Sequence, residues 1–86
     1  MHTIELLAEA LDLAARLGWQ VRQDWLDGNG GGLCELRGRK IFFLDLALSP
    51  GEQLDQVLDA LRREPDAVRL PMAASLRELL ALRKTA

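Results

Sequence analysis

The fold of this chain is decided by the stretch Ile41-Phe42-Phe43-Leu44-Asp45-Leu46-Ala47-Leu48-Ser49-Pro50-Gly51-Glu52. Its first half, 41–46, is almost wholly apolar. This predicts a central strand that is buried on both faces, or one covered by helices on one face and by a partner on the other. The second half is a capping box, in which the Ser49 side chain caps a helix and Glu52 reaches back to the Ser49 N–H. Pro50 suits the first helical position. The stretch therefore predicts a buried strand followed closely by a helix.

Another helix is expected upstream, over about residues 4–17. Thr3 is its candidate N-cap, because its side-chain oxygen can accept from a free N–H of the first turn. Gly18 is the expected C′ residue, because glycine adopts a positive φ without cost. The apolar residues between them recur at helical spacing, in a stripe of Ile4, Leu7, Leu11 and Ala15.

Three strands are expected, at about 20–25, 32–37 and 41–46. The first strand alternates polar and apolar residues, and the glycine-rich segment 27–32 supplies the turn that follows it. Gly38 suits the first central position of a type II′ turn between the second and third strands. Because the connections between strands are short, we expect an antiparallel meander.

The helix that follows Ser49 is expected to end at Pro65, and Pro71 is expected to open a last helix. The segment Glu64–Leu70 is then a loop. The element order is α-β-β-β-α-α in a single domain, 1–86. The predicted fold class is α+β, with a three-stranded antiparallel sheet packed with helices.

Composition excludes several functional classes. The chain has 86 residues, of which 49% are hydrophobic, and a net charge of -2, so it is too short for a multidomain enzyme. No apolar run reaches the ~18–20 residues that a membrane span needs, and the start, Met1 to Glu5, lacks the basic segment of a signal peptide. The single cysteine, Cys34, excludes an intramolecular disulfide and a cysteine-built zinc site. We expect a cytoplasmic protein that does not contact a membrane.

The residues also argue against catalysis. His2 is the only histidine and lies at a terminus, so we assign it no role. Cys34 is expected to be a buried structural thiol, because no histidine can serve as its base. The glycine-rich loop 28–32 joins two strands, whereas a phosphate cradle needs a helix N-terminus after it. We therefore expect a protein that is not an enzyme and uses no cofactor or metal.

Two alternatives stay open. A cleft that binds a small molecule or catalyses a reaction could be lined by Arg22, Asp24, Glu35, Arg37 and Asp45, although cross-strand ion pairs are the competing explanation for these charges. Asp45, at the end of a buried strand, either bonds the backbone N–H groups of the next turn or lines a pocket. The second alternative is nucleic-acid binding through the C-terminal basic residues. The pI of about 5.3 and the interleaved acids disfavour that partner. These basic residues are Arg62, Arg63, Arg69, Arg77, Arg83 and Lys84.

The chain resembles small uncharacterised bacterial proteins over three segments, which are Gly30 to Lys40, Phe42 to Leu46 and Ser49 to Leu54. Over about residues 30–63 its arrangement also resembles the core of zincin-type metallopeptidases. In that family a hairpin sheet leads into a helix with a His-Glu-x-x-His motif. Here the helix reads Gln56-Val57-Leu58-Asp59-Ala60-Leu61-Arg62, without the two histidines that would hold zinc. The resemblance therefore implies a non-catalytic relative.

The apolar content favours self-association. With 49% hydrophobic residues and 19 leucines, the chain carries more apolar surface than we expect a domain of this size to bury. We therefore expect a non-enzymatic protein–protein interaction module that forms a homodimer, or that binds another protein. We expect the contact at the sheet face or edge and at the last helix. The candidate interface residues are Trp19, Trp25, Leu76, Leu79, Leu80 and Leu82.

Overall fold

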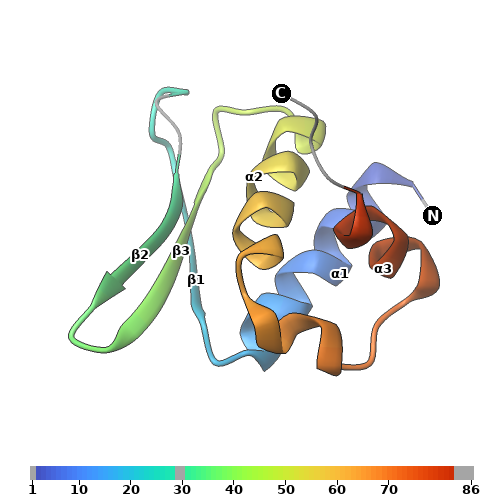
Figure 1. Ribbon diagram of the computed structural model, residues 1–86. Coiled ribbons are helices and arrows are strands. Elements are labelled where there is room, and N and C mark those ends of the chain that lie inside the picture. The colour runs from blue at the N-terminus through green and yellow to red at the C-terminus, as the bar shows by residue number, and fades with distance from the viewer. Residues whose placement is uncertain (1, 29–30, 83–86) are drawn as a thin grey trace.

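The computed structural model describes residues 2–28 and 31–82. The elements in these ranges follow the expected order α-β-β-β-α-α, with a short 3₁₀ helix before the last helix (Figure 1). They are α1 (Thr3–Arg16), β1 (Gln20–Asp24), β2 (Gly32–Leu36), β3 (Arg39–Asp45), α2 (Pro50–Arg62), the 3₁₀ helix η1 (Pro65–Arg69) and α3 (Ala74–Ala81). The predicted α+β class is confirmed.

The sheet is mixed, so the predicted antiparallel meander is wrong. The strand order is β1-β3-β2, and β3 pairs parallel with β1 and antiparallel with β2. The central place of β3, predicted from its apolar sequence, is confirmed. It forces the connection after β1 to cross to the far edge, where Gly31 lies so close that an added Cβ would stand 1.8 Å from the Phe43 carbonyl oxygen. The preference of neighbouring strands for each other is outweighed here by the burial of the most apolar strand at the centre.

The turn between β2 and β3 also differs from the expectation. Leu36 pairs with Arg39, so Arg37 and Gly38 form a two-residue loop. Both have a positive φ, 53° for Arg37 and 78° for Gly38. Positive φ at both central positions is the mark of a type I′ turn, whereas the expected type II′ turn has it only at the first. Gly38 therefore takes the second central position.

Of the predictions for the two ends of α1, that for the N-terminal end is wrong and that for the C-terminal end is confirmed. The N-cap is His2, which makes no side-chain capping bond, and Thr3 is already helical. The predicted Thr3 cap is therefore wrong. At the other end Gly18 has a φ of 89°, as predicted. The Gly18 N–H donates to the Ala15 carbonyl at 2.9 Å, and the Trp19 N–H donates to the Ala14 carbonyl at 3.1 Å. This pair of bonds is a Schellman motif.

The capping box at α2 is confirmed. The Ser49 hydroxyl accepts from the Glu52 N–H at 3.3 Å, and Glu52 Oε1 accepts from the Ser49 N–H at 3.0 Å. The segment after α2 differs from the prediction, because Pro65 opens η1 where a loop was expected. The last helix begins at Ala74, three residues beyond the proline expected to open it.

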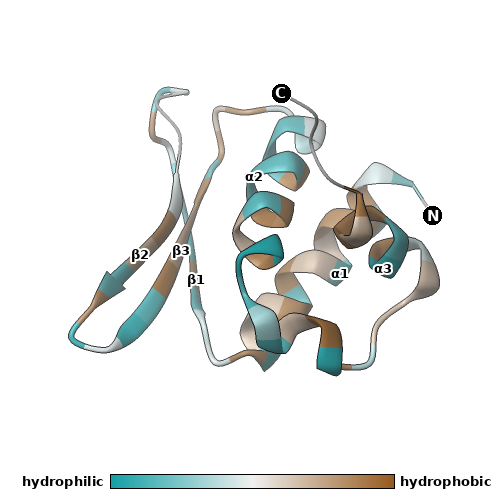
Figure 2. Cartoon of the chain, viewed as in Figure 1, coloured by the Kyte–Doolittle hydropathy of each residue, from teal (hydrophilic) through white to brown (hydrophobic). Residues whose placement is uncertain are grey.

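The helices share one core with one face of the sheet (Figure 1). This core includes Leu13 of α1, Phe42 of β3, Val57 of α2 and Leu76 of α3, none of which is exposed. Hydrophobic and hydrophilic residues alternate along α2, as expected for a helix with one buried side (Figure 2). Among the described residues, we find no helix with the length and apolar character needed to span a membrane.

Candidate functional site

The candidate functional site is the face of the sheet that the helices leave uncovered. Phe42 and Leu44 of β3 are 0% and 2% exposed and pack in the helical core. Because side chains alternate along a strand, Ile41 and Phe43 lie on the opposite face. The described helices all lie on the other side of the sheet (Figure 1). The sheet thus has one covered face and one open face.

The open face has an apolar centre with polar residues on β1. Ile41 and Phe43 of β3 are half-buried, and Leu36 near the turn is 59% exposed. Next to Phe43 is a shallow hollow of about 390 Å³, whose lining includes Leu26, Gly31 and Cys34. From the register, the open face consists of Gln20, Arg22, Asp24, Gly32, Cys34, Leu36, Arg39, Ile41 and Phe43.

Asp45 fixes one end of this face. It is 0% exposed, and its Oδ1 accepts from the Leu26 N–H at 3.0 Å and from the Ala47 N–H at 2.9 Å. Its backbone carbonyl accepts from the Gln53 side chain at 3.0 Å. Of the two roles expected for Asp45, bonding to backbone N–H groups is therefore the one observed. Since Asp45 points to the open face, its bond to Leu26 places the β1–β2 connection over the end of that face.

The outer edge of β1 is exposed. Four of its five residues are exposed and Val21 is half-buried. Trp25, which follows the strand, is 68% exposed. Asp24 Oδ1 accepts from the Trp25 N–H at 2.8 Å, which holds the chain as it leaves the strand. Such an edge presents backbone N–H and C=O groups that a further strand can pair with.

The five residues of the expected cleft are spread over different surfaces. Arg22 and Asp24 lie on the open face of β1, whereas Glu35 pairs with Lys40 in register and so lies on the helix-facing side. Arg37 stands in the hairpin turn, and Asp45 is buried beneath the connection. Asp24 and Asp45 are register partners. The structure brings together only the two strand-end aspartates and Arg22, all on one face.

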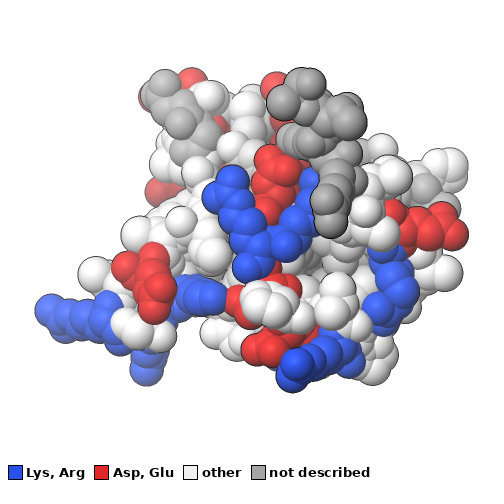
Figure 3. Space-filling model, viewed as in Figure 1, with Lys and Arg blue, Asp and Glu red and all other residues white. Residues whose placement is uncertain are grey.

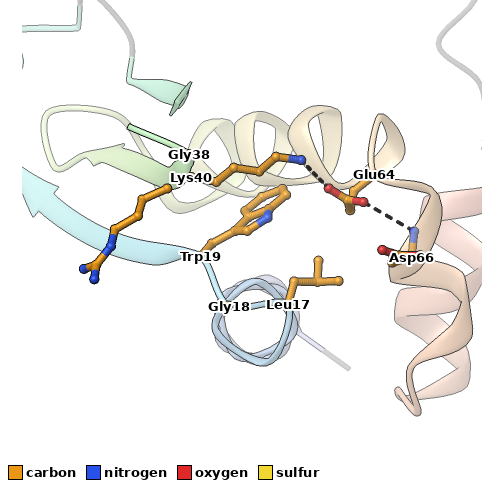
Figure 4. A pocket seen from close by; sticks show the side chains of 8 residues that line it. Leu17, Gly18, Trp19, Gly38, Lys40, Glu64 and Asp66 are labelled. Carbon is orange, nitrogen blue, oxygen red and sulfur yellow. Dashed lines mark hydrogen bonds and ion pairs between the residues drawn. The ribbon is translucent and has the colours of Figure 1, made fainter. Parts of the chain in front are cut away.

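A polar pocket lies at the other end of the sheet, on the helix side (Figure 4). It has a volume of about 320 Å³ and is lined by residues that include Trp19, Lys40, Glu64 and Asp66. Lys40 Nζ donates to Glu64 Oε2 at 2.6 Å, and the Glu64 side chain is only 12% exposed. This bond lowers the pKa of Glu64 and raises the pKa of Lys40.

The Lys40–Glu64 pair gives this pocket a structural role. It joins β3 to the residue that caps η1, since Glu64 Oε1 also accepts from the Asp66 N–H at 3.5 Å. Each charge has the other as its partner. Sequence reasoning missed the pair, because the two residues are 24 positions apart and no spacing rule links them.

The predicted interface residues divide into buried and exposed ones. Trp19 and Leu76 are 6% and 0% exposed. Both belong to the core of the single chain, so their assignment to an interface is wrong. Leu79 and Leu80 are half-buried and pack against the same core. Trp25 and Leu82, at 68% and 60% exposed, are the predicted anchors that remain accessible.

The C-terminal arginines mostly bind the chain itself. Arg62 donates to Asp59 and to the Leu79 carbonyl, which joins α2 to α3. Arg77 donates to two backbone carbonyls, those of Val68 and Leu70. Basic and acidic residues are interspersed on the surface seen in Figure 3. Arg83 and Lys84 lie outside the described residues.

The remaining sequence expectations concern single residues. Cys34 is exposed on the open face, so the expectation of a buried thiol is wrong. His2 is exposed next to the first helical residue. Within residues 2–28 and 31–82 no three His, Cys, Asp or Glu side chains are grouped as a metal site requires.

Comparison with known protein families, with curated proteins and with solved structures gives no match to this chain.

Proposed function

We propose that this protein is a non-enzymatic interaction module that forms a homodimer through the sheet side of the molecule. The observation that carries the proposal is that the sheet is covered on one face only. Ile41, Phe43 and Leu36 stand on the uncovered face, where Leu36 is 59% exposed, and Trp25, which follows the edge strand β1, is 68% exposed. Apolar residues gathered on one side of a small domain mark a surface that another protein covers.

A second copy of the chain is the favoured partner. The open face carries charges of both signs on a single strand, Arg22 and Asp24, so it can be complementary to itself about a two-fold axis. A partner of one dominant charge would fit this pattern less well. The large exposed aromatic ring of Trp25 is the type of side chain that anchors interfaces.

The two alternative functions have less support. A catalytic or ligand-binding cleft needs convergent polar groups, but Glu35 and Arg37 lie apart from Arg22 and Asp24. Nucleic-acid binding needs basic side chains that are free to contact phosphates, but Arg62 and Arg77 are held by backbone carbonyls of the chain.

The proposal is tested by comparing two variants that remove equally exposed apolar side chains. Trp25→Ser lies on the sheet side, whereas Val68→Ser lies on η1 and is 62% exposed in the wild type. Sedimentation equilibrium measures the dissociation constant of the dimer for each. We expect Trp25→Ser to raise it and Val68→Ser to leave it unchanged. A dimer that is weakened by Val68→Ser alone would place the contact on the helical side and contradict the proposal.

A further inference from the structure

Within the proposed homodimer, on which this inference rests, we infer that two copies of β1 pair edge to edge, antiparallel, about a two-fold axis at Gln23. The result is a continuous six-stranded sheet in the order β2-β3-β1-β1-β3-β2. Arg22 of each copy then lies opposite Asp24 of the other.

The edge is favoured over stacking of two open faces. The β1–β2 connection passes over the open face at Asp45, where the Leu26 N–H is bound. A second sheet therefore cannot lie flat along the whole of that face. Among the described residues β1 pairs with β3 alone, so its other edge carries no strand, and Gln23 and Asp24 there are exposed.

Backbone geometry decides which residues face the partner. The Asp24 carbonyl accepts from the Leu46 N–H at 2.8 Å, so the polar backbone groups of Asp24 point toward β3. Because these groups alternate along a strand, those of Arg22 also point toward β3, while those of Val21 and Gln23 point outward. An antiparallel partner must pair outward groups with outward groups. The two-fold axis can then lie at Val21, Arg22 or Gln23.

Charge selects the axis at Gln23. An axis at Arg22 places the two arginines directly opposite each other, which is unfavourable. An axis at Val21 places Arg22 opposite Gln20 of the partner, so neither Arg22 nor Asp24 gains an opposite charge. Only the axis at Gln23 sets each Arg22 against Asp24 of the partner, in a pair that is not hydrogen-bonded and whose side chains stand close.

The local bonds of the free chain are compatible with this register. Asp24 Oδ1 already accepts from the Trp25 N–H, and a carboxylate has a second oxygen that can accept from the arginine of the partner. Because Asp24 Oδ1 holds the Trp25 N–H, the next outward pair, Val21 with Trp25 of the other copy, does not form, and the paired ladder is short and centred on Gln23. Its symmetric pair supplies two backbone hydrogen bonds, with the two ion pairs on either side of the axis.

A charge-swap series tests the register. Arg22→Asp sets four carboxylates around the axis, and we expect the dimer dissociation constant to rise by about tenfold. The double variant Arg22→Asp/Asp24→Arg restores opposite charges in the same register and should return the constant to near the wild-type value. Arg39→Asp is the matched control, because it makes the same change on the open face of β3, away from the edge. Circular dichroism verifies that each variant is folded.

A disulfide experiment tests the contact independently of charge. Paired Gln23 residues would have Cα atoms about 5.5 Å apart, within the range that a disulfide bridges. Gln23→Cys/Cys34→Ser should therefore form a covalent dimer on mild oxidation. The wild type should not, because the two copies of Cys34 would be five strand spacings, or about 24 Å, apart.

The outcomes separate this inference from the proposed function. A wild-type dimer that Arg22→Asp leaves intact, or that crosslinks through Cys34, overturns the β1 pairing and keeps the homodimer. A wild type that stays monomeric overturns both. A weaker dimer in Arg22→Asp, recovery of the affinity in the double variant and a disulfide at position 23 together establish the inference.

Discussion

At the scale of single residues, Ser49 holds the start of α2 and offers a direct test of local stability. Its hydroxyl accepts from the Glu52 N–H, and Glu52 Oε1 accepts from the Ser49 N–H. Ser49→Ala should lower the free energy of unfolding by about 1 kcal/mol. Thr3→Ala is the control, because Thr3 does not cap α1 and its removal should change little. Urea denaturation measures both, and equal effects of the two would contradict the assignment.

Asp45 ties the β1–β2 connection to the segment that leads into α2. One of its carboxylate oxygens, Oδ1, accepts from two N–H groups, those of Leu26 and Ala47. Asp45→Ala leaves both donors without this acceptor, and we expect it to cost about 2–3 kcal/mol. Asp45→Asn keeps one oxygen and should cost less, while Asp55→Asn on the exposed side of α2 should have almost no effect. Equal stability of the Ala and Asn variants would show that the two hydrogen bonds matter little.

At the scale of elements, replacing a glycine by alanine should have opposite effects on stability in the β2–β3 hairpin and in α2. Gly38 has a φ of 78° in the type I′ turn, so Gly38→Ala should destabilise the protein by about 1 kcal/mol. Gly51 lies in the first turn of α2 with an ordinary φ and open space around it. Gly51→Ala should therefore stabilise by about 0.5 kcal/mol. Thermal melts compare the two, and a change of the same sign would contradict the turn assignment.

The Lys40–Glu64 pair predicts a dependence of stability on pH. Its hydrogen bond lowers the pKa of Glu64 in the folded state. The stabilisation is thus present above pH 4.5, the ordinary pKa of this side chain, and is lost as the pH falls through the lowered pKa. The pKa of Lys40 is raised in the folded state. The stabilisation contributed by charged Lys40 is therefore lost only as the pH rises through that raised pKa, above 10.5.

In Glu64→Gln, the free energy of unfolding should therefore fall less between neutral and acidic pH than in the wild type. The measurement is the urea midpoint at a series of pH values for the wild type and the variant. Glu78→Gln, on the exposed side of α3, is the matched control and should follow the wild type. A Glu64→Gln curve parallel to that of the wild type would show that the ion pair does not contribute.

Local signals predict the ends of elements better than their pairing. The cap at Ser49 and the C′ glycine at Gly18 were predicted because each depends on residues within one turn. The mixed sheet was not, because hydrogen-bonding partners far apart in sequence leave no local mark. The strongest clue was the apolar sequence of β3, which required a central strand and was already in conflict with a meander.

In the candidate site, too, the features that depend on neighbouring residues could be predicted and those that depend on distant ones could not. The apolar sequence of β3 predicts a central strand that is either buried on both faces or covered by helices on one face and by a partner on the other. The described helices cover one face only, and Ile41 and Phe43 lie on the other. Which aromatic residues lie in the core could not be predicted. Trp19 is buried because the Schellman motif of α1 turns it into the helical layer, whereas Trp25 follows the last residue of β1 and stays exposed.

At the scale of the whole molecule, the protein is a two-layer domain whose described helices cover one face of a three-stranded sheet. In the proposed dimer another copy of the chain extends the sheet at its β1 edge, from three strands to six. Such a contact covers the exposed edge of β1, which would otherwise be open to pairing with other chains. The charged pattern of β1 then sets the register as well as the affinity.

The most direct test of this claim is the molar mass in solution, measured by light scattering on a size-exclusion column over a range of protein concentrations. A homodimer would give a mass of twice 9.6 kDa that falls toward 9.6 kDa only on strong dilution. A mass of 9.6 kDa at every concentration would contradict it.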